Sequence, residues 1–131
     1  MKFCATKRLN TSANVPITAL AIPQAGGTVY SEPISTIHDV GFLTLLLNEA
    51  HGGGTGSLNV TAQYSFDGIN FYPIYTTAAA ALTIDADIVD ALANEIRMIT
   101  VTARMAPFIR LAFAPNQDSV LTADLAYQDE A

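Results

Sequence analysis

Hydrophobic and polar residues alternate most regularly over residues 57–77. The apolar positions 58, 60, 62, 64 and 66 are separated by polar ones, and this period of two predicts a half-buried strand. Asp67-Gly68 follows and suits a type I′ turn, in which both central residues need positive φ. We therefore predict a β-hairpin with a two-residue loop and a core-facing side. The residue pairs expected on that side are Phe66–Ile69, Tyr64–Phe71 and Ala62–Pro73.

The rest of the chain repeats short apolar stretches with turn residues about every ten positions, a pattern typical of a β-sandwich or jelly roll. Residues 37–49 are apolar on both sides of the predicted strand, which favours a central strand or one covered by a partner. Residues 78–95 combine acidic residues with helical spacing and predict a long loop or one short helix. The other expected strands are 15–22, 28–34, 96–104, 107–114 and 119–127, the last two joined as a hairpin across 115–118.

These patterns predict an all-β fold, a β-sandwich of jelly-roll type with about seven or eight antiparallel strands and at most one short helix. A single domain covers residues 15–131, because 131 residues can bury a core without metal or disulfide. Residues 1–14 are predicted to be an extended arm that becomes ordered on a partner.

The composition favours an assembly. Charged residues make up only 14% of the chain, against about 25% in typical soluble domains. The net charge is −6, and beyond the arm the cations are only Arg97, Arg104 and Arg110, so no basic patch for nucleic acid is expected. No apolar run approaches the roughly 20 residues of a membrane span. The basic start has no apolar h-region after it, so we expect synthesis in a cytoplasm without a signal peptide.

Candidate catalytic and metal-binding groups are few. His38 and Asp39 are neighbours on a strand and point to opposite faces, and His51, in the glycine loop 51–56, is expected to be solvated. That loop lacks a Lys-Ser/Thr ending and precedes a strand, which argues against a phosphate loop. The acidic cluster Asp85, Asp87 and Asp90 departs from the EF-hand pattern, and Cys4 is the only cysteine. We predict no enzymatic activity, no catalytic residue, no bound metal and no cofactor.

Aromatic residues gather at Tyr30, Tyr64, Phe71, Tyr72 and Tyr75, where they could form a sugar-binding platform. The alternation places Tyr64, Phe71 and Tyr75 toward the core and only Tyr72 outward, so core packing is the favoured interpretation. Arg110 shares a face with Phe108 and Ala112. We expect it to be paired or to reach a subunit contact, because a buried unpaired guanidinium is costly.

The hairpin YSFDGINFYPI, the Ala/Thr-rich stretch after it and the closing PFIRLAFAPNQDSVLTADLAY resemble small virion proteins of tailed bacteriophages. In these proteins an SxDGxxF/W hairpin and a terminal strand with (Y/F)(I/V)R(L/V) recur on β-sandwich domains. The resemblance covers residues 57–127 and is one of pattern. It implies a capsid decoration (cement) protein, or another accessory head or tail protein, that acts by surface contact.

The resemblance further implies a homo-oligomer, with a trimer favoured, that binds the major capsid protein on the virion surface. The candidate partner contacts are Lys2, Lys7, Arg8, His51, Tyr72 and Arg110. One alternative is a different virion part, such as a tail tube, neck or head fibre. A carbohydrate- or receptor-binding module would need an exposed aromatic cluster, and an enzyme would need a pocket that joins His38 or His51 to an acid.

Overall fold

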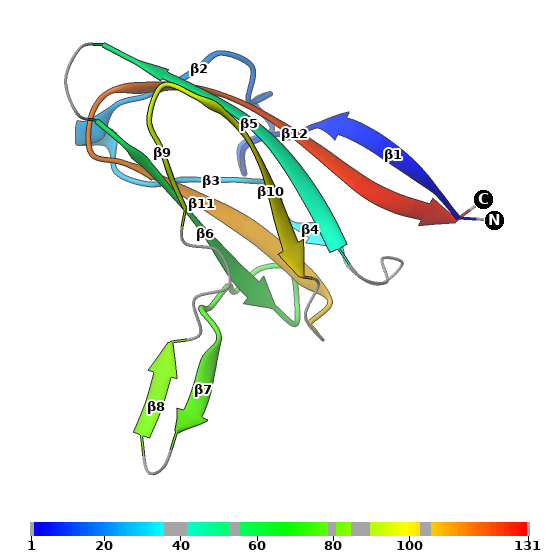
Figure 1. Ribbon diagram of the computed structural model, residues 1–131. Helices are drawn as coiled ribbons and strands as arrows, with labels where there is room; N and C mark the ends of the chain where they lie inside the picture. The colour runs from blue at the N-terminus through cyan, green and yellow to red at the C-terminus, as the bar shows by residue number, and fades with distance from the viewer. Residues whose placement is uncertain are drawn as a thin grey trace.

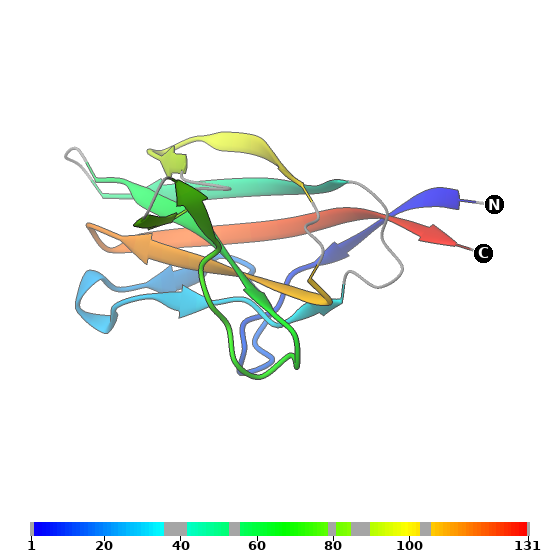
Figure 2. The ribbon, with the colours of Figure 1, turned by 90° about the horizontal axis from the view of Figure 1, so that it is seen from below.

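Two antiparallel β-sheets pack face to face (Figures 1 and 2). The structure is a computed structural model and describes residues 2–35, 42–52, 56–78, 81–84, 90–102 and 106–130. One sheet has the order β1-β12-β5-β10, with β2 also paired to β12. The other has the order β3-β11-β6-β9, with β4 also paired to β11. A separate hairpin, β7-β8, projects from the sandwich in Figure 1.

The elements are β1 (Lys2–Arg8), β2 (Leu20–Ile22), a 3-10 turn η1 (Gln24–Gly26), β3 (Val29–Tyr30), β4 (Ile34–Ser35), β5 (Phe42–His51), β6 (Leu58–Ser65), β7 (Tyr75–Ala78), β8 (Ala81–Ile84), β9 (Asp90–Leu92), β10 (Ile96–Thr102), β11 (Phe108–Pro115) and β12 (Ser119–Glu130).

The strand order is that of a jelly roll. We count β2 as the continuation of β1, and β3 with β4 as one interrupted strand. The main strands then pair as first, eighth, third and sixth in one sheet, and as second, seventh, fourth and fifth in the other. Two interleaved Greek keys produce this order. The predicted all-β sandwich of jelly-roll type is therefore confirmed.

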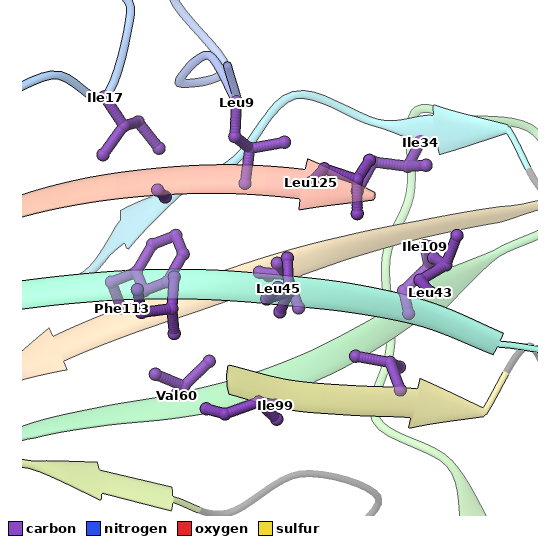
Figure 3. Packing of buried hydrophobic residues seen from close by; sticks show 14 of the residues in the cluster. Leu9, Ile17, Ile34, Leu43, Leu45, Val60, Ile99, Ile109, Phe113 and Leu125 are labelled. Carbon is purple, nitrogen blue, oxygen red and sulfur yellow. The ribbon is translucent and has the colours of Figure 1, made fainter. Parts of the chain in front are cut away.

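Strand alternation builds the core. Leu43, Leu45 and Leu47 of β5 point inward and are almost fully buried. In the ladder with β12, Leu45 lies opposite Leu125. Across the sandwich they meet the inward side chains of the other sheet, among them Val60 and Phe113 (Figure 3). Each fully buried leucine contributes about 1.5–3 kcal/mol of transfer free energy.

The first residues belong to the sandwich. Residues 2–8 pair with residues 124–130 as the edge strand β1. The following segment is fixed as well: Leu9 is fully buried, and its N–H donates to the Ala123 carbonyl at 3.0 Å. The prediction of an arm that needs a partner is therefore wrong for residues 2–8, because β12 provides the backbone partner within the chain.

The predicted two-residue hairpin at Asp67-Gly68 is wrong. Strand β6 ends at Ser65, and the backbones of Tyr64 and Tyr72 pair through two hydrogen bonds of 2.9 Å. Residues 65–71 form a longer loop, in which Gly68 has a φ of 76° whereas Asp67 has no positive φ. Tyr64 is buried as expected. Phe66 and Ile69, predicted to face the core, are 84% and 79% exposed.

The predicted hairpin across 115–118 is also wrong, because β11 and β12 lie in different sheets. The turn between them is tied to the start of β6: the Asn116 N–H donates to the Ser57 carbonyl, and the Ser57 N–H donates to Asn116 Oδ1 at 2.7 Å. The inward residues of β11 and β12 therefore meet across the core and not side by side.

Residues 78–95 contain strands where the structure describes them. The backbone of β7 pairs with that of β8, and β9 pairs with β6, where buried Leu92 lies opposite Leu58. The helical alternative is wrong for 81–84 and 90–92, and residues 85–89 lie outside the described part. The strand predicted over 37–49 runs as β5 from residue 42 to 51, and residues 36–41 lie outside the described part.

Two neighbouring leucines test this register. Leu45 is fully buried and Leu46 is 39% exposed on the opposite face of β5. We expect Leu45→Ala to lower the free energy of unfolding by about 2–5 kcal/mol, because it leaves a cavity. The control Leu46→Ala should lower it by about 1 kcal/mol or less. Urea unfolding measures both values, and equal losses would contradict the assigned register.

Candidate functional site

The first sheet exposes a broad, nearly uncharged surface. We call it the β5 face: the side of β1/β2-β12-β5-β10 that points away from the core. Its residues, placed by alternation and register, are Cys4, Thr6, Arg8, Ala21, Thr44, Leu46, Asn48, Ala50, Ile96, Met98, Thr100, Val120, Thr122, Asp124 and Ala126.

Large apolar side chains are exposed on the β5 face. Ile96 is 67% exposed, Met98 71%, Leu46 39% and Val120 40%. Leu46 lies directly opposite Met98 in the β5-β10 ladder. A shallow groove of about 540 Å³ runs past them and is also lined by Arg8 and Asp124.

The charges of the β5 face compensate each other. Arg8 Nε donates to Asp124 Oδ1 at 2.6 Å, and Arg8 Nη1 donates to the Thr18 hydroxyl. The two side chains sit on adjacent strands, where Arg8 lies opposite Asp124. The face therefore presents apolar and threonine side chains around one satisfied ion pair.

Part of the outer side of the second sheet, around Phe108 and Arg110, is covered by the chain itself. The loop 66–71 folds back over it, so that a Cβ on Gly68 would lie 3.4 Å from the Phe108 ring. Phe71 of the same loop stacks on Arg110, with 4.6 Å between the guanidinium carbon and the ring centroid. The two sheets thus differ within the described residues: a loop covers part of one outer side, and none covers the β5 face.

Arg110 lies against two aromatic rings. Its guanidinium carbon lies 3.9 Å from the Tyr30 ring centroid on β3, and the Phe71 ring is its second neighbour. Its Nε donates to Gln63 Oε1 at 2.8 Å, from the position directly opposite on β6. The prediction that Arg110 shares a face with Phe108 and Ala112 is confirmed. The structure shows the hydrogen bond to Gln63, and a subunit contact through Arg110 stays a prediction.

Asp67 organises the loop 66–71. Its Oδ1 accepts the backbone N–H groups of Ile69 at 2.9 Å and of Asn70 at 2.8 Å, and the Ser65 hydroxyl donates to the same oxygen. These bonds, the two backbone N–H donors first, hold the pKa of Asp67 well below its ordinary value. Side-chain bonds of this kind compete with ladder pairing, which explains why the two-residue hairpin does not form.

A groove of about 710 Å³ lies beside this loop. Phe66 and Tyr72, 84% and 64% exposed, line it together with Pro73 and Ile74. The expected outward position of Tyr72 is confirmed. The polar groups of the groove include Asp67 and its partners, whose hydrogen bonds are mostly made within the loop.

His51 is joined to a buried acid. Its Nδ1 lies 2.8 Å from Oε1 of Glu49, and the side chains are 2% and 0% exposed. The Asn94 backbone N–H donates to the other carboxylate oxygen at 2.7 Å, and Asn94 Nδ2 lies 3.2 Å from His51 Nε2. Full pairing requires that Nδ1–H donates to Glu49 and that Nε2 accepts from Asn94. The His51 side chain is therefore buried, and the prediction that it is solvated is wrong; its role as a partner contact stays a prediction.

The Glu49-His51 pair has the geometry of a structural clamp. Ser119 lies opposite His51 in the β5-β12 ladder, but its hydroxyl donates to the Gln117 carbonyl at 3.1 Å. His51 Nε2 is directed at Asn94, whose φ of 52° places its backbone N–H on Glu49. The clamp thus fixes the end of β5 to the turn before β10.

The remaining predicted contacts are placed as follows. Lys7 is 43% exposed and lies 3.5 Å from Glu32, and Arg8 is bound to Asp124. The backbone of Lys2 pairs with Glu130, and its side chain lies outside the described part. His38, Asp39, Asp85 and Asp87 are not among the described residues.

No cluster of three or more His, Cys, Asp or Glu side chains in the described ranges is placed to hold a metal ion. No helix in the described part of the chain is long and apolar enough to cross a bilayer.

The sequence contained signals for three features that the predictions missed. Ile96 and Met98 alternate with inward residues, which marks them as a pair on one side of a strand. Glu49-x-His51 has the spacing that puts both side chains on one face of a strand. The loop 66–71 had a signal in the spacing of Ser65, Asp67 and Asn70, which suits side-chain to backbone bonds.

Comparison with known proteins finds no protein-family model that matches the chain and no curated protein that matches it in sequence.

The Asp67 carboxylate should stay ionised in acid. A pKa lowered in the folded state means that its stabilising effect is complete above the ordinary value of 3.8 and is lost only as pH falls well below it. We expect the Asp67 carboxyl ¹³C signal to titrate below the ordinary range of exposed aspartates. A titration midpoint near 3.8 would contradict the loop geometry.

A glutamine substitution at Glu49 tests the clamp, and the same substitution at Glu95 is its control. Glu49 is fully buried, whereas Glu95 is 34% exposed and paired with Arg97 at 2.6 Å. We expect Glu49→Gln to lower the free energy of unfolding by about 1–3 kcal/mol, because an amide cannot accept both buried N–H donors. Glu95→Gln should cost less than about 1 kcal/mol. Denaturant unfolding measures both, and an equal loss in the two variants would exclude the clamp.

Proposed function

We propose that this chain is a capsid decoration protein of a tailed bacteriophage. It forms a homo-oligomer, a trimer in the favoured case, binds the major capsid protein on the outer surface of the virion and stabilises the shell at subunit junctions. The observation that carries this proposal is the β5 face. The sequence resemblance of residues 57–127 to small virion proteins provides the identity of the partner.

The β5 face has the properties of a contact surface. Single exposed hydrophobic residues are common on soluble domains, but contiguous apolar patches mark interaction sites. Here Leu46 and Met98 are direct neighbours across a ladder, and Ile96 lies two residues from Met98 on the same side of β10. Burying this face desolvates few charges, because its single ion pair is already formed. A chain of net charge −6 can therefore associate through it without placing like charges together.

The β5 face alone is smaller than a stable protein interface. Four strands about 4.8 Å apart, with about seven residues of about 3.3 Å along each, give an area of about 450 Å². Stable interfaces bury about 800 Å² on each partner. Elements beside the face must supply the rest. The ends of β1 and β12 belong to the same sheet and extend beyond the sandwich, so they are placed to contribute, whereas the β7-β8 hairpin projects from the side of the second sheet (Figures 1 and 2).

The mechanism is mechanical. Each bound copy buries apolar surface across a junction and so opposes the separation of the shell subunits it contacts. An oligomer that holds several contacts at once gains from effective concentration, so modest single contacts give firm attachment. The protein would be made in the host cytoplasm and act on the capsid surface. A tail-tube, neck or head-fibre subunit would use the same face for a ring or a fibre contact.

A carbohydrate- or receptor-binding module is the second candidate. The exposed Phe66 and Tyr72 beside the 710 Å³ groove favour it, since aromatic rings stack on sugars. Against it, Asp67, Ser65 and Asn70 bond to one another, which leaves few polar groups to orient sugar hydroxyls.

Two lysine substitutions separate the candidates. We expect Met98→Lys, on the β5 face, to weaken binding to decoration-free capsids at least about tenfold, because it places an unpaired charge in an apolar contact. The control Phe66→Lys, in the groove, should leave capsid binding unchanged. Co-sedimentation with capsids measures binding, and unfolding curves should change by about 0.5 kcal/mol or less in both variants, since both residues are exposed.

The opposite outcome supports the second candidate. Full capsid binding by Met98→Lys, together with loss of glycan binding in Phe66→Lys, would overturn the decoration proposal. Truncation of the first residues is a poorer test, because residues 2–8 form β1 and Leu9 is fully buried.

A further inference from the structure

Among the residues that the structure describes, Arg110 has no carboxylate partner. The other Lys and Arg side chains that are described have one each: Lys7 with Glu32, Arg8 with Asp124, and Arg97 with Glu95. Within the described residues the hydrogen bond of Arg110 is the one from Nε to Gln63. Its two terminal nitrogens, Nη1 and Nη2, together carry four N–H donors that find no acceptor in this part of the chain.

The guanidinium is fixed in place. The guanidinium carbon lies 3.9 Å from the Tyr30 ring centroid and 4.6 Å from that of Phe71, so both rings restrict its movement. Gln63 holds the inner edge from the opposite position on β6. Most of the rotamer entropy that a free arginine loses on binding is therefore already lost in the unbound protein. Ala112, on the same face of β11, is only 5% exposed, so the Arg110 side chain has little space to move into on that side.

A carboxylate is the ligand that fits this arrangement. The terminal edge of a guanidinium presents parallel N–H groups that match the two oxygens of a carboxylate. A phosphate group, with more charge, is usually held by several cations or by a helix N-terminus. Arg110 has neither among the described residues, and the net charge of −6 disfavours a polyanion.

We propose that Arg110, Tyr30, Phe71 and Gln63 form a carboxylate-binding site that takes a single Asp or Glu side chain of a partner protein. Arginine and tyrosine are enriched among residues that dominate the energy of protein interfaces, and aromatic rings shield such contacts from water. The site lies on the sheet opposite to the β5 face. It goes beyond the proposed function, since it concerns a different surface and a defined chemical group.

Sodium acetate and a short capped peptide with one aspartate are the probes. We expect the Arg110 Nε–H signal in ¹⁵N NMR to shift saturably with acetate, but not with sodium chloride at equal ionic strength. The aspartate peptide should bind at least about tenfold more tightly than its asparagine version. Arg110→Lys should remove this preference, because lysine keeps the charge and loses the planar pair of donors. Phe71→Leu should weaken binding several-fold.

Arg97→Lys is the matched control, because Arg97 already has its carboxylate in Glu95. It should leave acetate and peptide binding unchanged. Equal binding of the aspartate and asparagine peptides would overturn the proposal, as would an equal loss in both lysine variants. A stronger response to inorganic phosphate than to acetate would overturn the choice of carboxylate. All these measurements use the isolated chain, so their failure is distinct from a failure of capsid binding.

Discussion

The ladder between β5 and β12 is the pairing on which the rest of the structure depends. It joins residues 44–51 to residues 119–126 and places Leu45 opposite Leu125 in the core. Because β5 is apolar on both sides, its own sequence leaves open which side is buried. The polar residues of β12 settle the question: Thr122 and Asp124 must face outward, and Asp124 pairs there with Arg8 of β1. A shift by one residue would exchange the two faces. The exposure of Leu46 and Met98 is thus a consequence of this register.

The sequence patterns predicted the strands well and their partners poorly. Alternation in β6, β11 and β12 depends on neighbouring residues alone, and the buried positions Val60, Leu111 and Leu125 are those the pattern indicates. Whether two successive strands share a sheet depends on distant residues. The turn after β11 crosses between sheets because Asn116 is tied to Ser57, far away in the chain. At Asp67-Gly68 the sequence favours a tight turn, but the hydrogen bonds of the Asp67 carboxylate stabilise a longer loop instead.

The candidate site was predictable in its outline. The outward positions of Arg110 and Tyr72 follow from strand alternation, but the two rings around Arg110 come from β3 and from the loop 66–71. No local sequence pattern indicates that side chains from separate segments will meet in this way. The prediction of a solvated His51 was wrong for a different reason. The glycines after His51 suggested a solvated loop. Glu49, two residues before it, is buried and holds the imidazole inside the fold. The prediction weighed the residues that follow His51 and not the one on its own strand face.

The difference in cover between the outer sides of the two sheets is relevant to the proposed function. The loop 66–71 covers the part of the second sheet's outer side around Phe108 and Arg110, through Gly68 and Phe71, while the described chain places no comparable cover on the β5 face. A monomer gains nothing from this difference, since exposed Ile96 and Met98 favour aggregation. A subunit of an assembly gains a face that is buried only on binding. With the proposed Arg110 site on the opposite side of the sandwich, one copy would offer two dissimilar surfaces to two neighbours. Binding both neighbours at once would then oppose their separation, which is the mechanical role that a position at a subunit junction requires.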